Sequence, residues 1–264
     1  MLVVLKSNYE ELSLEAARMV ANSIRQNPQL RLGLATGSTT VGVYRELVRL
    51  HREESLDFSG VVTFNLDEYL GISPEHPQSF HRFMTEHFFS HVNLNPGNIH
   101  IPDGTISADY EKYCAGYEAV IQNAGGIDLQ ILGIGRNGHI GFNEPTSSFA
   151  SKTRLKVLSK ATLEDNRKFF GLGETMPRLA ITMGIGTILA SRRVLMLATG
   201  AAKAGAVANA IEGPLTASVT ASALQLHADA TAIVDEEAAA QLKQKDYYRD
   251  VMEMTVLFTP GKLS

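Results

Sequence analysis

The sequence predicts an α/β protein: a doubly wound, mainly parallel sheet with helices on both faces. Short apolar runs alternate with longer segments of helical periodicity along most of the 264 residues, which is typical of this class. The runs 127–135 and 192–200 are continuously apolar and end in glycine, as strands buried on both faces do. The chain has no internal repeat or low-complexity linker, so we expect one domain over residues 1–264.

In the first half of the chain, three helices are expected to alternate with two strands. The first helix begins at Ser13, a capping residue with Glu15 two positions later. The second carries its apolar residues, among them Tyr44 and Leu47, on one stripe. The expected elements are helix 13–27, strand 30–36, helix 40–54, strand 61–66 and helix 79–92.

The second half continues the alternation with one less regular stretch. Cys114 lies in a helical segment and is expected to be a buried or partly buried core residue. Residues 142–190 are less regular and are expected to hold a flap over the sheet. The other expected elements are strands 127–135 and 192–200, helix 203–213, and a strand followed by a helix within 230–242.

The composition excludes several classes of protein. The chain has 24 Lys and Arg against 28 Asp and Glu, a net charge of −4, and 44% apolar residues, which argues against a disordered chain and a nucleic-acid partner. A single cysteine allows no intrachain disulfide and fits a reducing compartment. The four-residue apolar run before Lys6 is too short for a signal peptide or membrane span, so we expect a cytoplasmic protein.

Ligands of such sheets bind beyond the carboxyl ends of the strands, so we expect the functional residues at these ends. The segment ATGSTT follows an expected strand and opens a helix. Its backbone N–H groups and hydroxyls suit a phosphate, although a glycine turn followed by a helix cap would read the same. The segment lacks the Lys of a nucleotide P-loop. Its candidate ligands are Thr36, Gly37, Ser38 and Thr39.

A second strand end, GIGRNG at 133–138, has the glycine spacing of a dinucleotide-binding motif. Such a site needs a helix directly afterwards and an acidic residue about 20 positions further on. Here Gly141 and Pro145 break any helix, and residues 151–163 contain no Asp or Glu. We therefore reject the nucleotide interpretation.

The residues after that motif suit proton transfer. His139 and Glu144 are five apart on a tight loop, with Asn137 beside them, and a carboxylate that holds an imidazole tunes it for acid–base work. Asp67 ends an apolar strand, where burial can raise its pKa toward that of a useful base. Lys203 begins a helix, an unfavourable place for a cation that suggests an anionic ligand. Each of these residues also has a simpler alternative role. His139 and Asp67 could cap turns, and Lys203 could be a solvated surface lysine.

Histidines also cluster between positions 76 and 91, but no carboxylate or cysteine completes a metal-binding set there. A helical surface explains them.

Taken together, the motifs resemble the glucosamine-6-phosphate deaminase family. The resemblance rests on the TGST segment 36–39, FNLDEY at 64–69 and GHIGFNEP at 138–145, and it runs from about Leu30 to about Leu242. It implies a doubly wound α/β fold, shared with 6-phosphogluconolactonases and sugar-phosphate isomerases. That fold agrees with the pattern of strands and helices.

The resemblance also implies a reaction: glucosamine 6-phosphate and water give fructose 6-phosphate and ammonium, in N-acetylglucosamine catabolism, without a metal or redox cofactor. By the family mechanism His139 opens the sugar ring, Glu144 holds His139, and Asp67 moves a proton from C2 to C1 through an enolamine. Asn137 stands where many members have Asp. Because an amide cannot be a base, its implied role is orientation.

For the phosphate, the resemblance implies the 36–39 segment together with Lys203. The family's phosphate-binding Arg falls at Lys168 in this chain, with Arg167 preceding it, and Lys does not reproduce a bidentate Arg fork. We favour Lys168 by register.

Some members are activated by N-acetylglucosamine 6-phosphate at a subunit interface, which implies a homo-oligomer. Ser147, Arg154 and Lys156 match positions of that effector site, whereas Val157 replaces a Thr.

The sequence also allows two alternative functions. A 6-phosphogluconolactonase would share the fold and the phosphate loop, but its members do not continue as IGFNEP. A non-catalytic sugar-phosphate sensor would have no need of Asp67, His139 and Glu144 together.

Overall fold

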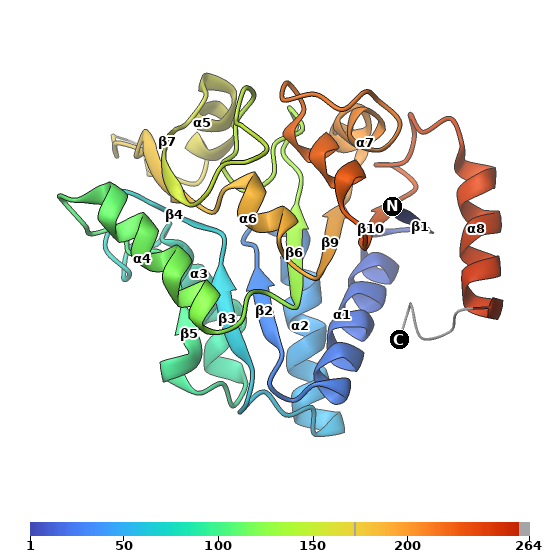
Figure 1. Cartoon of the computed structure of the whole chain (residues 1–264), viewed down its shortest axis with the longest axis horizontal. Helices are drawn as coiled ribbons and strands as arrows, with labels where there is room; N and C mark the ends of the chain where they lie inside the picture. The colour runs from blue at the N-terminus through green and yellow to red at the C-terminus, as the bar shows by residue number, and fades with distance from the viewer. Residues whose placement is uncertain (172, 259–264) are drawn as a thin grey trace.

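The computed structural model describes residues 1–171 and 173–258; residue 172 of the predicted flap and the last six residues of the predicted domain lie outside the described residues. A seven-stranded parallel sheet in the order β1-β10-β9-β6-β2-β3-β5 forms the centre (Figure 1), which confirms the predicted fold class. Its strands are β1 (Leu2–Lys6), β2 (Arg31–Leu34), β3 (Val62–Asn65), β5 (Ile99–His100), β6 (Leu129–Gly133), β9 (Arg193–Ala198) and β10 (Ala230–Asp235).

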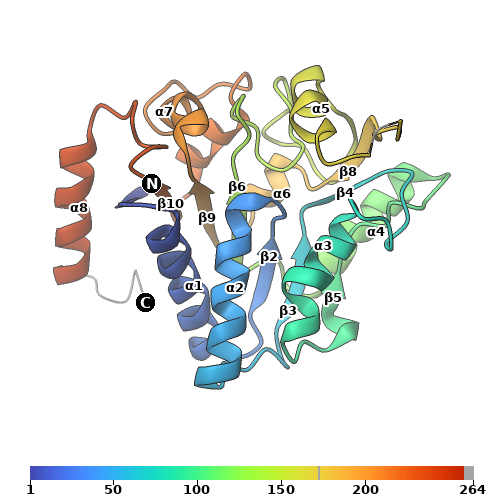
Figure 2. The same cartoon turned by 180° about the vertical axis from the view of Figure 1, so that it is seen from behind.

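Helices cover both faces of this sheet because alternate strand side chains are apolar on both sides. One face packs against α1 (Tyr9–Gln26), α2 (Ser38–Glu54), α3 (Phe80–His87) and α8 (Lys245–Phe258), seen from behind in Figure 2. The other packs against α4 (Tyr110–Asn123), α6 (Ile185–Leu189), α7 (Ala204–Ile211) and the 3-10 segment η4 (Thr220–Leu226).

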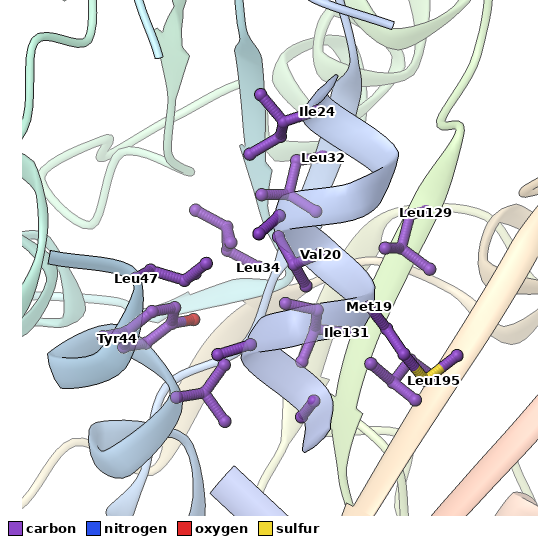
Figure 3. Close-up of a cluster of buried hydrophobic side chains, with 14 of the residues drawn as sticks. Met19, Val20, Ile24, Leu32, Leu34, Tyr44, Leu47, Leu129, Ile131 and Leu195 are labelled. Atoms are coloured by element: carbon purple, nitrogen blue, oxygen red, sulfur yellow. The ribbon is translucent and has the colours of Figure 1, made fainter. Parts of the chain in front are cut away.

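The core between the sheet and α1 and α2 is shown in Figure 3. Leu32 and Leu34 of β2 and Ile131 of β6 are fully buried there, in one cluster with Val20 of α1 and Leu47 of α2. Each such side chain stabilises the fold by about 1.5–3 kcal/mol. This packing fixes the strands whose ends carry the site.

A second, three-stranded sheet in the order β4-β8-β7 lies beyond the carboxyl ends of the main strands. It consists of β4 (Asp67–Tyr69), β8 (Leu179–Thr182) and β7 (Arg154–Val157), all antiparallel. The helix α5 (Lys160–Arg167) follows β7 and lies at the same end of the molecule (Figure 1). The described part of the irregular stretch 142–190 thus contains the strands β7 and β8 and the helices α5 and α6, of which α6 is buried.

The chain reverses its direction across the sheet between β2 and β6. From β2 it proceeds outward to β3 and β5, and then returns to β6 on the other side of β2. The loops after these two neighbouring strands therefore diverge and leave a crevice, the usual ligand site of an open α/β sheet.

Several predicted boundaries were wrong for local reasons. Helix α1 begins at Tyr9, not at Ser13, because the side chain of Asn8 caps it by accepting from the N–H of Glu11. The helix expected at 79–92 ends at His87 and is followed by the 3-10 segment η1 (Phe89–His91).

The helix expected directly after the strand at 230 is also wrong. The carboxylate of Asp235 accepts N–H groups of Gly200 and Ala238 and turns the chain, so helix begins only at Lys245. The strand expected at 61–66 ends at Asn65. The remaining 3-10 segments are η2 (Pro96–Asn98) and η3 (Ala201–Lys203).

Cys114 lies in α4 and is buried, as predicted. Neither β1 nor α8 was predicted. Among the described residues, no helix combines the length and the hydropathy needed to cross a membrane.

Candidate active site

A cleft of about 510 Å³ opens at the crevice between the ends of β2 and β6. The structure brings most of the predicted site residues to it. Those that line the cleft are Thr36, Gly37, Ser38, Thr39, Asp67, His139 and Lys203.

One end of the cleft suits an anion. Gly37 has φ +122°, a conformation that disfavours side chains, and it lets the chain turn directly from β2 into α2. Helix α2 begins at Ser38 with no side-chain cap, so its first N–H groups, apart from that of Thr40, are available to a ligand.

Lys203 supplies a cation at the same end. It lies in the segment after β9 that begins at Gly200, where φ is +86°. Burial lowers the pKa of Lys203, nearby Arg136 and Lys168 lower it further, and Asp165 opposes them. An arriving phosphate would therefore meet a positive field that one carboxylate only partly compensates.

Asp67 enters the cleft from β4, where it pairs with Thr182 of β8. Asp67 is only 6% exposed. Burial and the adjacent Glu68 carboxylate raise the pKa of Asp67 to about 8, against a weaker lowering effect of the Phe142 N–H. A carboxylate of this kind is a base poised near neutral pH.

Glu68 was not predicted as a site residue, but it connects the strand that carries Asp67 to the segment before α3 that lines the cleft. Its carboxylate accepts the Ser79 hydroxyl at 2.7 Å and the N–H groups of Phe80 and His81 at 3.0 Å. These donors form the start of α3, and residues 77–80, which lead into this helix, line the cleft. The only sign of Glu68 in the sequence is that two acidic residues follow an apolar run. That sign does not tell which carboxylate acts as the base and which one holds the start of α3.

His139 is held close against the loop that follows β6. The N–H of Gly135 donates to the His139 carbonyl at 2.8 Å, and the imidazole lies over Gly135, where a Cβ would come within 2.4 Å of Cε1. The glycine spacing of the false nucleotide motif thus has another purpose here, since Gly135 makes room for the ring.

Glu144 and Asn137 complete the group around His139. Glu144 Oε2 accepts from Asn137 Nδ2 at 3.1 Å and lies 3.6 Å from His139 Nδ1. Asn137 Oδ1 accepts the His139 N–H at 3.2 Å. The structure thus brings the three residues Asn137, His139 and Glu144 together.

The pKa of Glu144 reflects these neighbours. Burial acts to raise it, but His139, the Thr162 hydroxyl and the Ser159 N–H outweigh burial and lower the pKa to about 2. Glu144 therefore stays ionised through the physiological range and can stabilise a protonated imidazole.

An aromatic wall, which was not predicted, closes another side of the cleft. Tyr69 packs against Phe80, Phe142 and Phe170, with ring centroids 4.9–5.8 Å apart. Phe169 also lines the cleft although it is 54% exposed. The pair 169–170 follows α5, so this segment contributes part of the wall.

Neither Lys168 nor Arg167 lines the cleft. The ammonium of Lys168 lies 5.1 Å from the centre of the Phe169 ring, near enough to Lys203 to lower its pKa. Arg167 donates to the carbonyl of Glu174 at 2.6 Å.

The predicted effector residues lie outside the cleft, on and beside β7. Arg154 donates to Asn143 Oδ1 at 2.9 Å, and burial lowers its pKa. Burial and Arg154 lower the pKa of Lys156. Ser147 is buried, and its hydroxyl has no partner in the part of the chain that the structure describes.

Within residues 1–171 and 173–258, no group of three or more His, Cys, Asp or Glu side chains is placed to hold a metal ion.

A family model described as glucosamine-6-phosphate isomerases/6-phosphogluconolactonase matches residues 6–233. The glucosamine-6-phosphate deaminase of Thermoanaerobacter pseudethanolicus is 50% identical over 246 residues, which cover 93% of this chain and 97% of that protein. The deaminase of Shewanella loihica is 50% identical over 251 residues, covering 95% and 93%.

Solved structures give the same relationship. A monomeric glucosamine-6-phosphate deaminase superposes with a TM-score of 0.89 at 46% identity, over 91% of this chain and all of that one. A 6-phosphogluconolactonase from Trypanosoma cruzi superposes with a TM-score of 0.73 at 20% identity, over 92% and 97%, and shares the fold. With a match over residues 6–233 and relatives that are half identical along nearly their whole length, the chain belongs to the family of glucosamine-6-phosphate isomerases and 6-phosphogluconolactonases.

Proposed function

We propose that this chain is a glucosamine-6-phosphate deaminase, which converts glucosamine 6-phosphate and water into fructose 6-phosphate and ammonium in amino-sugar catabolism. The observation that carries the proposal is the convergence of Asp67 and His139, backed by Glu144, on one cleft. The relatives that are half identical to this chain bear the same name.

The substrate phosphate binds at the start of α2. Uncapped N–H groups of the 36–39 segment and the Lys203 ammonium provide donors and positive charge there. The sugar then extends toward Asp67 and His139, which line the same cleft.

His139 opens the pyranose ring by moving a proton between the ring oxygen and the anomeric hydroxyl. Glu144, ionised beside Nδ1 of the imidazole, stabilises its protonated form. Asn137 joins the two by hydrogen bonds and orients them without exchanging a proton.

Asp67 then removes the proton from C2 of the open-chain sugar and returns it at C1 through an enolamine. A carboxylate whose pKa is raised to about 8 is a stronger base than an exposed one. Water adds to the resulting C2 imine, and the C–N bond breaks to leave the ketone and ammonia.

A flap formed by α5 and the aromatic pair that follows it shields the sugar from solvent. Phe170 is part of the aromatic wall, and Asn166 and Phe169 line the cleft. A cleft closed in this way strengthens the electrostatic interactions inside it.

A second anion site is also proposed, at Ser147, Arg154 and Lys156. Burial lowers the pKa of both cations, an effect that Glu144 opposes only at Lys156, and among the described residues the buried Ser147 hydroxyl has no partner. The phosphate of a second sugar phosphate would pair with the two cations and accept a hydrogen bond from the Ser147 hydroxyl. That this second ligand activates the protein in a homo-oligomer stays a prediction, and the solved relative at 46% identity is monomeric. A cytoplasmic location also stays a prediction.

The experiment that tests the proposed function compares two substrates. We expect ammonium release from glucosamine 6-phosphate and no acid release from 6-phosphogluconolactone. Acid release without ammonium would identify a lactonase, and tight binding of sugar phosphate without turnover of either substrate would identify a sensor. Repeating the assay with N-acetylglucosamine 6-phosphate tests the second anion site.

A further inference from the structure

The Glu144 carboxylate lies between two parts of the chain that are separate in sequence. Its Oε2 atom faces the loop after β6, with Asn137 Nδ2 at 3.1 Å and His139 Nδ1 at 3.6 Å. Its Oε1 atom faces the start of α5, where it accepts the Thr162 hydroxyl at 2.5 Å and the Ser159 N–H at 3.1 Å.

The Thr162 hydroxyl donates its only proton to this carboxylate. Its oxygen accepts from Ser159 Oγ at 3.1 Å, so its single proton points to Glu144. Thr162 is 3% exposed, and water has little access to replace the donor. A hydrogen bond to a charged acceptor in such a place is among the strong hydrogen bonds of proteins.

We propose that Thr162 is a positioning residue for His139: its hydroxyl fixes one oxygen of Glu144, so that the other faces the imidazole. The inference deepens the proposed function by adding a residue that never meets the substrate. Among the contacts that Oε1 makes with the described residues, only this one comes from a side chain.

The arrangement also connects α5 to the acid–base group. Thr162 lies in the first turn of α5, and Asn166, one turn further along the same helix, lines the cleft. The start of α5 thus supplies two donors to Oε1, and together with Asn137 Nδ2 on Oε2 they hold the carboxylate toward His139.

Removal of the hydroxyl at constant shape tests the proposal. Thr162→Val keeps the volume and deletes the donor, whereas Thr162→Ser restores it. Thr187→Val is the matched control, because Thr187 Oγ1 donates to a buried carboxylate, Glu118, at 2.6 Å, and neither residue lines the cleft.

Two readouts are measured: the ¹⁵N chemical shifts of the His139 ring during a pH titration, and kcat and KM for ammonium release. For Thr162→Val we expect altered His139 shifts and a kcat lower by about tenfold, which corresponds to about 1.4 kcal/mol, with KM within twofold of the wild type. Thr162→Ser should recover both readouts, and Thr187→Val should change neither.

The proposal is overturned if Thr162→Val retains the wild-type His139 titration and tautomer. It is also overturned if Thr187→Val alters them equally, since the effect would then be a general loss of stability. Circular dichroism verifies the fold, and Thr162→Ala takes the place of Val if that variant does not fold. If the wild type releases no ammonium, the proposed function fails, while the ring shifts still decide the positioning role.

Discussion

A methyl group on Gly135 would lie 2.4 Å from Cε1 of His139 and 2.5 Å from its Nε2, closer than non-bonded atoms approach. The imidazole thus occupies the space that any other side chain at position 135 would need. The N–H of the same glycine donates to the His139 carbonyl, so the backbone and the ring are fixed together.

Gly135→Ala is therefore expected to displace the imidazole from its place beside Glu144. A shift of about 1 Å at a reacting group can cost about a hundredfold in rate, and we expect kcat/KM to fall by at least that factor. Ammonium release measures the fall, and thermal unfolding measures the accompanying loss of stability.

Gly116→Ala in α4 is the control, because a Cβ there would meet no atom within 4 Å and the residue does not line the cleft. Equal losses of activity in the two variants would show that the effect is not due to His139.

Asp67→Asn is expected to stop turnover and, above neutral pH, to stabilise the protein. The pKa of Asp67 is about 8 in the folded protein and about 3.9 in an unfolded chain. A raised carboxyl pKa means that stability is lost as the pH rises from about 4 to about 8, because the unfolded state ionises first. Asparagine has the same shape and no charge to bury, so it escapes this loss.

Denaturant unfolding at pH 4.5, 6.5 and 8.5 measures the difference in free energy between the two proteins. We expect the advantage of the variant to increase with pH and to exceed about 2 kcal/mol at pH 8.5. A difference that does not vary with pH would contradict the raised pKa, and residual turnover near the wild-type rate would exclude Asp67 as the base.

Lys203→Gln is expected to weaken binding of the phosphate more than it slows the reaction. Because the ammonium is half-buried beside the start of α2, its loss removes a charge-assisted interaction of about 1.5–3 kcal/mol. We therefore expect KM for glucosamine 6-phosphate to rise by about 10–100-fold, with a smaller change in kcat.

Lys160→Gln is the control, since Lys160 is exposed at the start of α5 and does not line the cleft. If KM is unchanged in Lys203→Gln, the phosphate lies elsewhere in the cleft.

From the sequence we could predict those parts of the site that directly follow a recognisable apolar run. Thr36 and His139 follow strands that are visible as apolar runs, and rules for parallel sheets place the ends of such strands together. The placement of Asp67 was only partly foreseen. It lies in a strand of three residues whose partner, β8, is more than 100 positions away, and no local periodicity marks so short and so distant a pairing.

The same reason explains the residues that were missed. Glu68 contacts the start of α3, and Thr162, in the first turn of α5, contacts Glu144. These segments become neighbours of the cleft only in the folded chain. The aromatic wall likewise collects Tyr69, Phe142 and Phe170 from three separate segments. Such groups depend on tertiary packing, and a linear pattern of residue types does not encode them.

Lys168 and Arg167 are expected to differ although they are adjacent. Lys168 lies near Lys203 and is exposed, with only an aromatic ring under its ammonium, so it is free to turn toward a phosphate. Arg167 donates a hydrogen bond to the Glu174 carbonyl.

We expect Lys168→Ala to raise KM by about 3–10-fold and Lys168→Arg to restore it. Arg167→Ala is expected to leave KM within twofold while it loosens the segment around Glu174. Steady-state kinetics at low and high salt measure the first two effects, and limited proteolysis measures the third. The reverse order, with KM raised by Arg167→Ala alone, would assign the phosphate contact to the arginine.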